Sequence, residues 1–221
     1  MGGVDTIESC EDRERRGHMS IELWAVRLER PLTAEETEAM MALLPPERRD
    51  RLLRVRQEER RQEPLCAYFI LRQALEEQYG WRQLPEIALT NRGKPYFPQH
   101  PEVQFNLSHT AGAVLVGLAD EPLGVDIEHI RPVSQRAMRR LADVDTREDF
   151  FRSWVRREAR AKRSGDGVGT MMRDETPLRY GEVYYEIETF PGYAAGVASG
   201  GAERSGTVRR LVLSGAAEDI L

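Results

Sequence analysis

The 221-residue sequence has few cysteines, no long apolar run and no excess of positive charge. Its two cysteines, Cys10 and Cys66, lie far apart, which argues against a disulfide framework or a zinc site. The longest apolar stretch, residues 113–119, is much shorter than the roughly 20 residues that a membrane-spanning helix needs. The first residues are charged and lack the apolar core of a signal peptide. We therefore expect a cytoplasmic protein that does not act at a membrane.

The balance of charge narrows the classes of partner. The chain carries 32 basic and 37 acidic residues, a net charge of −5. A protein that binds nucleic acid through bulk positive charge needs the opposite balance, so we expect no nucleic-acid partner. A local basic pocket for a phosphorylated small molecule remains compatible with this composition. The hydrophobic content of 40% predicts a globular chain with a modest core, and the length fits one large domain or two small ones.

The order of the expected elements favours an α+β fold. We expect a disordered leader at 1–19, an N-terminal half at 20–120, a C-terminal half at 121–200 and a tail at 201–221 with one apolar patch, 208–213. Strands and helices alternate without a regular βαβ rhythm, which argues against a doubly wound sheet. Periodicity and turn signals predict strands at 21–28, 113–119, 123–128, 182–189 and 193–198, and helices at 33–44, 65–79, 134–141 and 146–163. Each half thus contains strands and one long helix, and we expect 113–119 and 123–128 to form a hairpin.

Two carboxylates in the strand 123–128 are candidate metal ligands. Asp126 and Glu128 are two residues apart, so a strand places both on one face, about 6.5–7 Å apart along the backbone. A hard cation such as Mg²⁺ is typically held by a few carboxylates and substrate phosphate oxygens. An isolated Asp-x-Glu is more often a solvated strand face, but the very apolar neighbouring sequence favours the metal site here.

A second candidate pair lies on the helix 146–163. Glu158 and Lys162 are four residues apart, the spacing of a common surface ion pair. They share one stripe of the helix with Trp154 and the pair Phe150–Phe151, and such a stripe points toward the core. We therefore expect Glu158 and Lys162 at the edge of the core, where a third carboxylate and a lysine suit phosphoryl chemistry.

Three further residues are weaker candidates for binding an anion. Ser108 and His109 directly precede a buried strand, and His109 alone would usually be a turn or core histidine. Lys94 lies in a rigid Gly93-Lys94-Pro95 turn, which by itself is unspecific. None of the three would identify a function without the other motifs.

The motifs occur together in an order that resembles one family. Gly-Lys-Pro at 93–95, Asn-Leu-Ser-His at 106–109, Gly-Val-Asp-Ile-Glu at 124–128 and Phe-Phe-x-x-Trp-x-x-x-Glu-Ala-x-x-Lys at 150–162 follow one another along the chain. This series resembles the Sfp-type 4′-phosphopantetheinyl transferases, over roughly residues 48–198. The resemblance implies two similar α/β-sandwich halves with pseudo-twofold symmetry, and coenzyme A (CoA) bound in the cleft between them.

The resemblance also implies a reaction and roles for residues. The family transfers the 4′-phosphopantetheine arm of CoA to a serine of an apo acyl or peptidyl carrier protein and releases 3′,5′-ADP. By this likeness Asp126, Glu128 and Glu158 hold Mg²⁺, and Glu158 and Lys162 are catalytic. Lys94, Ser108, His109, Arg157 and Lys162 are the implied CoA-binding residues. Because both halves belong to one chain, we expect a monomer.

Departures from the family pattern leave two alternatives open. Arg157 replaces the usual lysine before the helical glutamate, Val155 replaces a serine or threonine, and the segment 129–153 is shorter than usual. The short segment motivates a non-catalytic relative that binds CoA or a carrier protein without transfer. A further alternative is an unrelated Mg²⁺-dependent phosphohydrolase that uses the three carboxylates.

Overall fold

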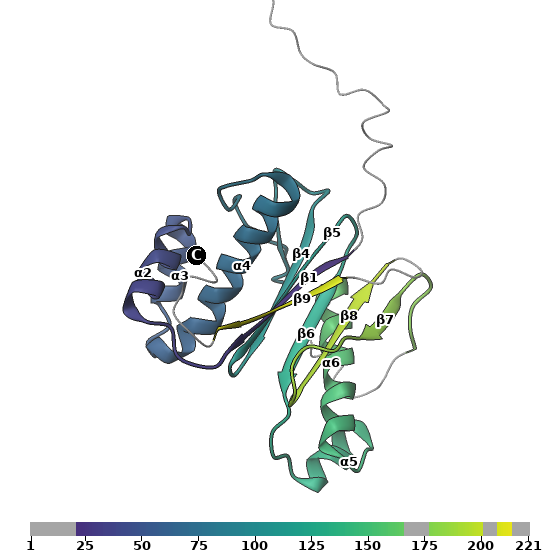
Figure 1. Cartoon of the computed structure of the whole chain (residues 1–221). Coiled ribbons are helices and arrows are strands. Elements are labelled where there is room, and N and C mark those ends of the chain that lie inside the picture. Colours follow the sequence, from purple (N-terminus) through teal and green to yellow (C-terminus); the bar gives the residue numbers. More distant parts are fainter. Residues whose placement is uncertain (1–20, 166–176, 201–206, 214–221) are drawn as a thin grey trace, which may run out of the picture.

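The computed structural model describes residues 21–165, 177–200 and 207–213. The leader expected at 1–19 lies outside this part of the chain. The chain is an α+β protein in which a mixed four-stranded sheet and an antiparallel three-stranded sheet lie face to face, with a long helix on the outer side of each (Figure 1). None of the helices in the described ranges combines the length and apolar character needed to cross a bilayer.

The first sheet has the strand order β4-β5-β1-β9, and its outer face is covered by α4. Its strands are β1 (Glu22–Leu28), β4 (Gln104–Thr110), β5 (Ala113–Ala119) and β9 (Thr207–Leu213). Short helices precede α4 (Gln62–Tyr79): α2 (Ala34–Ala42), α3 (Pro46–Leu53) and the 3₁₀ turn η1 (Glu58–Arg61). A two-stranded ribbon, β2 (Ala88–Leu89) and β3 (Pro95–Tyr96), lies between α4 and β4.

The second sheet has the strand order β6-β8-β7. Its strands are β6 (Gly124–His129), β7 (Val183–Glu186) and β8 (Tyr193–Ser199). The helices α5 (Gln135–Ala142) and α6 (Arg147–Ser164) follow β6, and α6 packs on the outer face of this sheet.

The two sheets share one order of connections. Leaving β9 aside, the first strand of each sheet in sequence (β1 or β6) pairs antiparallel with the third (β5 or β8), which also pairs antiparallel with the second (β4 or β7). A helix of 18 residues, α4 or α6, separates the first strand from the second. β9 extends the first sheet by pairing in parallel with β1, so the apolar patch at 208–213 is a strand of this sheet.

The boundaries of the long helices have local causes. Thr146 caps the start of α6 by accepting from the Asp149 amide, as expected from the sequence. Gly80 and Gly165 end α4 and α6 in left-handed conformations, with φ of 70° and 73°. α4 begins at Gln62, three residues before the expected start, because a proline in the first turn lacks only an amide that the helix leaves unused.

The hairpin expected from residues 113–128 is wrong. β5 pairs with β4 and β1, whereas β6 pairs with β8 in the other sheet. Leu123, Val125 and Ile127 instead pack face to face against the first sheet, in an apolar cluster that contains Leu115 and Leu23. β6 therefore belongs to the second sheet. Its apolar side chains are buried in the core between the two sheets.

Side chains of β4 join the two sheets at the edge where β4 meets β6. The Val125 amide donates to Asn106 Oδ1 at 2.9 Å, and the Ile127 amide donates to Ser108 Oγ at 3.3 Å. One step further along, the His129 amide donates to Thr110 Oγ1 at 3.4 Å. Alternate residues of a strand point to the same face, so three side chains of one strand can meet alternate amides of another. This side-chain ladder satisfies the free edge of β6 and fixes its register against β4.

Gly124 lets α6 approach β6 closely. A Cβ atom at this position would lie 2.0 Å from the Ala159 carbonyl oxygen and 2.3 Å from the Arg163 amide nitrogen. Both atoms belong to the backbone of α6, so a side chain would push the helix away from the strand. The glycine thus sets the distance between the carboxylates of β6 and the functional side chains of α6.

We predict that Gly124→Ala lowers the free energy of unfolding by about 3 kcal/mol, because the clash is with rigid backbone. The matched control is Gly117→Ala, whose Cβ would meet the movable side-chain ends of Leu123 at 2.7 Å and Val125 at 2.8 Å. We expect that variant to lose about 1 kcal/mol. Urea unfolding measures both, and equal losses would contradict the role assigned to Gly124.

Candidate active site

The candidate site lies where β4, β6 and α6 meet. Asp126 and Glu128 project from β6, Ser108 and Thr110 from β4, and Glu158 and Lys162 from α6. The strand alternation and the four-residue helical spacing expected from the sequence bring both pairs to this one place. Glu158 and Lys162 are half-buried, as expected for side chains at the edge of the core.

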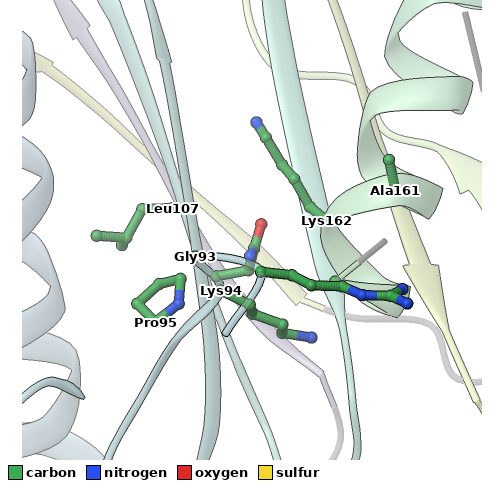
Figure 2. Close-up of a pocket in the computed structure, with 9 residues that line it drawn as sticks. Gly93, Lys94, Pro95, Leu107, Ala161 and Lys162 are labelled. Carbon is green, nitrogen blue, oxygen red and sulfur yellow. The ribbon is translucent and has the colours of Figure 1, made fainter. Parts of the chain in front are cut away.

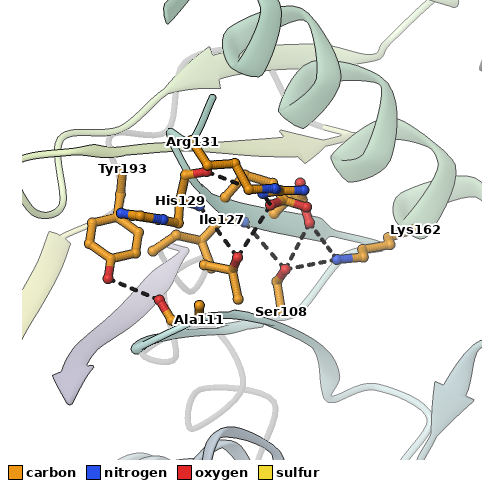
Figure 3. Close-up of polar contacts among 10 residues, drawn as sticks. Ser108, Ala111, Ile127, His129, Arg131, Lys162 and Tyr193 are labelled. Atoms are coloured by element: carbon orange, nitrogen blue, oxygen red, sulfur yellow. Dashed lines mark hydrogen bonds and ion pairs between the residues drawn. The ribbon is translucent and has the colours of Figure 1, made fainter. Parts of the chain in front are cut away.

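Asp126 Oδ1 is the centre of a three-atom cluster. Ser108 Oγ donates to Asp126 Oδ1 at 2.7 Å, and Lys162 Nζ donates to the same oxygen at 2.6 Å. Lys162 Nζ also donates to Ser108 Oγ at 2.9 Å, which closes a triangle of hydrogen bonds (Figure 3). Asp126 is only 3% exposed, so this ion pair lies largely out of water.

The second oxygen of Asp126 is not satisfied by the described residues. Oδ2 is buried and accepts no hydrogen bond from any of them, although buried carboxylate oxygens are normally satisfied. Burial raises the pKa of Asp126, and Lys162 and Ser108 act in the opposite direction. A hard cation would satisfy this oxygen, so the residue suits the metal role that the sequence suggests.

Glu128 and Glu158 complete the acidic side of the site. Glu128 accepts a hydrogen bond from Thr110 at 3.2 Å and forms an ion pair with Arg131 at 2.8 Å. Burial raises the pKa of Glu158, and the negative charges of Asp126 and Glu128 raise it further. The three carboxylates therefore lie close enough to repel one another. In the described part of the chain, however, no three acidic, histidine or cysteine side chains converge tightly enough to form a ready-made metal cluster.

A cavity of about 270 Å³ adjoins this cluster. Figure 2 shows the Gly93–Pro95 turn and Leu107 on one side and Ala161 and Lys162 on the other. Arg92 and Lys94 also line it, so its wall carries positive side chains from the turn at 92–95 as well as from α6. The chain has only two lysines among its 32 basic residues, Lys94 and Lys162, and both line this cavity.

Lys94 holds the turn against the end of α6. Its Nζ donates to the carbonyl oxygens of Arg163 at 2.6 Å and Leu123 at 3.3 Å. Burial lowers the pKa of Lys94 to about 8, and the nearby Arg163 charge acts in the same direction. Lys94 is therefore a structural link between the two layers as well as part of the cavity wall.

The structure places the other two candidates differently. The ring of His109 is exposed, but the protein packed around it and the charge of Lys162 lower its pKa, so the neutral imidazole is favoured. Arg157 is buried and donates to the Leu141 carbonyl of α5, about 100° around α6 from Glu158. It links α6 to α5 and is not brought to the cavity, so its position does not support a CoA contact.

Sequence comparison identifies relatives of this chain. The 4′-phosphopantetheinyl transferase Sfp of Bacillus subtilis strain 168 is 27% identical over 161 residues, which cover 67% of this chain and 72% of Sfp. The 4′-phosphopantetheinyl transferase psf-1 of Bacillus pumilus is 31% identical over 47% of this chain and 50% of its own length. AcpT of Escherichia coli K12, also a 4′-phosphopantetheinyl transferase, is 35% identical over 37% and 50%. No protein-family model matches the chain.

These matches, at 26–31% identity over up to 67% of the chain, support the Sfp-type 4′-phosphopantetheinyl transferases as the family that this chain resembles. Three residues of the site, Asn106, Thr110 and Arg131, received no role from the sequence alone. Asn106 and Thr110 complete the ladder on either side of Ser108, and Arg131 holds Glu128. The alternation of polar residues at 106, 108 and 110 was the available signal, since it marks one hydrogen-bonding face of a strand. Arg131 had no such signal, because its contact depends on how the chain turns after β6.

The lowered pKa of Lys94 predicts a pH dependence of stability. Between pH about 8, its pKa in the folded protein, and its ordinary value of 10.5, the unfolded chain binds more protons at this residue. The contribution of Lys94 to stability therefore increases as the pH rises through this window. Lys94→Met removes the titrating group, so the difference in unfolding free energy between wild type and variant should rise from pH 8 to pH 10.5. Urea unfolding at several pH values tests this, and a constant or falling difference would contradict the assignment.

Proposed function

We propose that this protein is an Mg²⁺-dependent enzyme that transfers the 4′-phosphopantetheine arm of CoA to a serine of an apo carrier protein and releases 3′,5′-ADP. The observation that carries the proposal is the meeting of Asp126, Glu158 and Lys162 beside a positively charged cavity. The relatives, each named as a 4′-phosphopantetheinyl transferase, support the same reaction.

The cavity suits the phosphate groups of CoA. Arg92, Lys94 and Lys162 line it, and the described residues of its wall include no carboxylate. Phosphate oxygens are favoured by such cations, with lysine acting as a compact point charge. We propose that Lys94, Ser108, His109 and Lys162 bind CoA, with the neutral His109 offering a ring nitrogen as hydrogen-bond donor.

Asp126, Glu128 and Glu158 are the proposed Mg²⁺ ligands. The unpartnered Asp126 Oδ2 and the mutual repulsion of the three carboxylates support this set. When bound, the ion would neutralise phosphate charge and act as a Lewis acid on the pyrophosphate. Thr110 and Arg131 would orient Glu128 through their contacts with its carboxylate.

The chemical step needs little from the protein beyond placement and one proton acceptor. The carrier serine oxygen attacks the β-phosphorus of CoA, and the bond from that phosphorus to the bridging oxygen breaks, so 3′,5′-ADP leaves. The serine proton passes to Glu158, whose raised pKa makes its carboxylate a better base. Lys162 stabilises the charge that develops on the phosphate oxygens.

We further propose that the two halves, 20–120 and 121–200, are related by a pseudo-twofold axis. The shared order of strand connections and the equal length of α4 and α6 support this relation. We also propose that the protein is a cytoplasmic monomer. One chain supplies every residue of the proposed site, and Cys66 is a free buried thiol, as is usual in a reducing compartment.

A non-catalytic relative that binds CoA or a carrier protein is the second candidate. It is favoured by the ion pair between Lys162 and Asp126 and by the short segment after β6, in which α5 has only eight residues. In this alternative the cavity would bind CoA, but the carboxylates would not assemble for transfer.

An intact-mass assay separates the two candidates. The protein is incubated with CoA, Mg²⁺ and a panel of apo acyl and peptidyl carrier proteins. We expect one carrier class to gain the mass of a single phosphopantetheine arm, and the gain to disappear with EDTA. CoA binding by calorimetry without any mass gain would instead identify the non-catalytic relative.

We predict that Asp126→Asn reduces transfer by about 100-fold or more, because it removes a negative charge that would hold Mg²⁺ at the reacting phosphates. The near-isosteric amide keeps the volume of the side chain, so far-UV circular dichroism should be unchanged. The control is Asp120→Asn, an exposed carboxylate at the end of β5 outside the site, which should transfer at the wild-type rate. Wild-type transfer by Asp126→Asn would remove Asp126 from the proposed metal site.

A further inference from the structure

The ammonium group of Lys162 and a metal ion would compete for one carboxylate. Lys162 Nζ lies 2.6 Å from Asp126 Oδ1, and this is the carboxylate that the proposed function assigns to Mg²⁺. A dication on the second oxygen of Asp126 and an ammonium on the first would be held within a few ångströms of each other, and like charges at that range repel strongly in a partly buried site. Full occupancy by both ions is therefore unfavourable.

The adjoining cavity offers the Lys162 ammonium group a second position. Its side chain lines the cavity that adjoins the cluster, together with Arg92 and Lys94. The Lys162 side chain is 26% exposed, compared with 5% for the Asp126 side chain, so the lysine is the more accessible partner of the pair. Rotation about the four-carbon stem would move its ammonium group into the cavity without a change in the backbone of α6. Phosphate groups in that cavity would attract it.

The use of lysine at this position supports a movable charge. The chain has 32 basic residues, and Lys94 and Lys162 are its only lysines, so the other basic positions are all arginine. A guanidinium group binds a carboxylate through a planar, two-pronged contact, whereas an ammonium group is a compact charge on a flexible stem. Lysine therefore fits a residue that exchanges one anion for another better than arginine does.

We propose that Lys162 is an exchangeable counter-ion that couples metal binding to CoA binding. Its ammonium neutralises Asp126 until a divalent cation takes over that carboxylate, and the lysine then pairs with a phosphate of CoA. This inference rests on the proposed function, since it names Mg²⁺ and CoA as the two ligands. It adds that the protein binds the divalent cation weakly by itself and more tightly together with CoA, and by linkage the reverse also holds.

The first test measures Mn²⁺ binding to the full chain by electron paramagnetic resonance of free Mn²⁺, without CoA. Lys162→Met removes the competing ammonium, so we expect Mn²⁺ to bind about tenfold more tightly than to wild type. The control is Lys94→Met, which removes the same charge from the same cavity. Within the described part of the chain, the Lys94 ammonium donates to backbone carbonyls and not to a carboxylate, so we expect less than about a threefold change. Unchanged or weaker Mn²⁺ binding by Lys162→Met would overturn the exchange.

A second measurement follows the wild-type protein, and a variant serves only to assign its signals. Because the chain has two lysines, ¹³C-lysine labelling gives only two Cε signals in the magnetic resonance spectrum, which Lys94→Met assigns. We expect the Lys162 signal to move when Mg²⁺ and CoA are added together and to move little with Mg²⁺ alone. A Lys162 signal that stays fixed in the presence of both bound ligands would overturn the proposal.

The two proposals fail in different ways. Tighter Mn²⁺ binding by Lys162→Met without transfer by the wild-type protein would support the exchange and count against the transferase reaction. Transfer by wild type with unchanged Mn²⁺ binding in Lys162→Met would support the reaction and reject the exchange.

Discussion

The ladder of hydrogen bonds from β4 side chains to the β6 backbone is the contact on which the site depends. Asn106, Ser108 and Thr110 accept from three alternate amides of β6 and so replace the neighbouring strand that this edge lacks. Each such bond contributes only about 1 kcal/mol net, but leaving a buried amide unpaired would cost more. The ladder thus fixes the register of β6 against β4 strongly, because a slip by one residue would also turn its apolar side chains away from the core between the sheets.

The same ladder also orients the carboxylates of the candidate site. Ser108 occupies the central rung and reaches Asp126 as well as the Ile127 amide, so one hydroxyl group both joins the layers and contacts the acidic cluster. Thr110 has the same double role toward Glu128 and the His129 amide. Tyr193 adds a further link by donating to the Ala111 carbonyl in the turn between β4 and β5 (Figure 3). The carboxylates are therefore oriented by the contact between the two layers rather than by either layer alone.

Electrostatic cost is concentrated at this contact. Three carboxylates lie within range of one another, one of them almost fully buried, and they are partly compensated by Lys162 at Asp126 and by Arg131 at Glu128. Removing charges from water is expensive unless each is paired, and Asp126 is paired through only one of its two oxygens. Such incompletely compensated groups are typical of sites that are completed by a ligand. The proposed binding of Mg²⁺ and CoA would supply the missing positive and negative partners.

The close approach of α6 to β6 brings the side chains of α6 near the carboxylates of β6. Gly124 permits backbone contact between the strand and the helix, and Gly165 ends the helix beside Lys94. Lys94 then donates to the Arg163 carbonyl in the last turn of α6 from the other layer, where its positive charge interacts favourably with the negative end of the helix dipole. The cavity is the space that these contacts leave between the turn and the helix.

The sequence by itself determined most of the local structure and the pairs of candidate site residues. Alternation in β6 placed Asp126 and Glu128 on one face, and the four-residue spacing in α6 aligned Glu158 with Lys162, because both depend only on the repeat of the backbone. Only the tertiary structure decided that β5 and β6 lie in different sheets, that residues 207–213 form a strand beside β1, and that Arg157 faces α5 instead of the cavity. It also decided which partner each carboxylate has. These features depend on which surfaces are buried against each other, and contacts between residues far apart in the chain leave no periodic signal in the sequence.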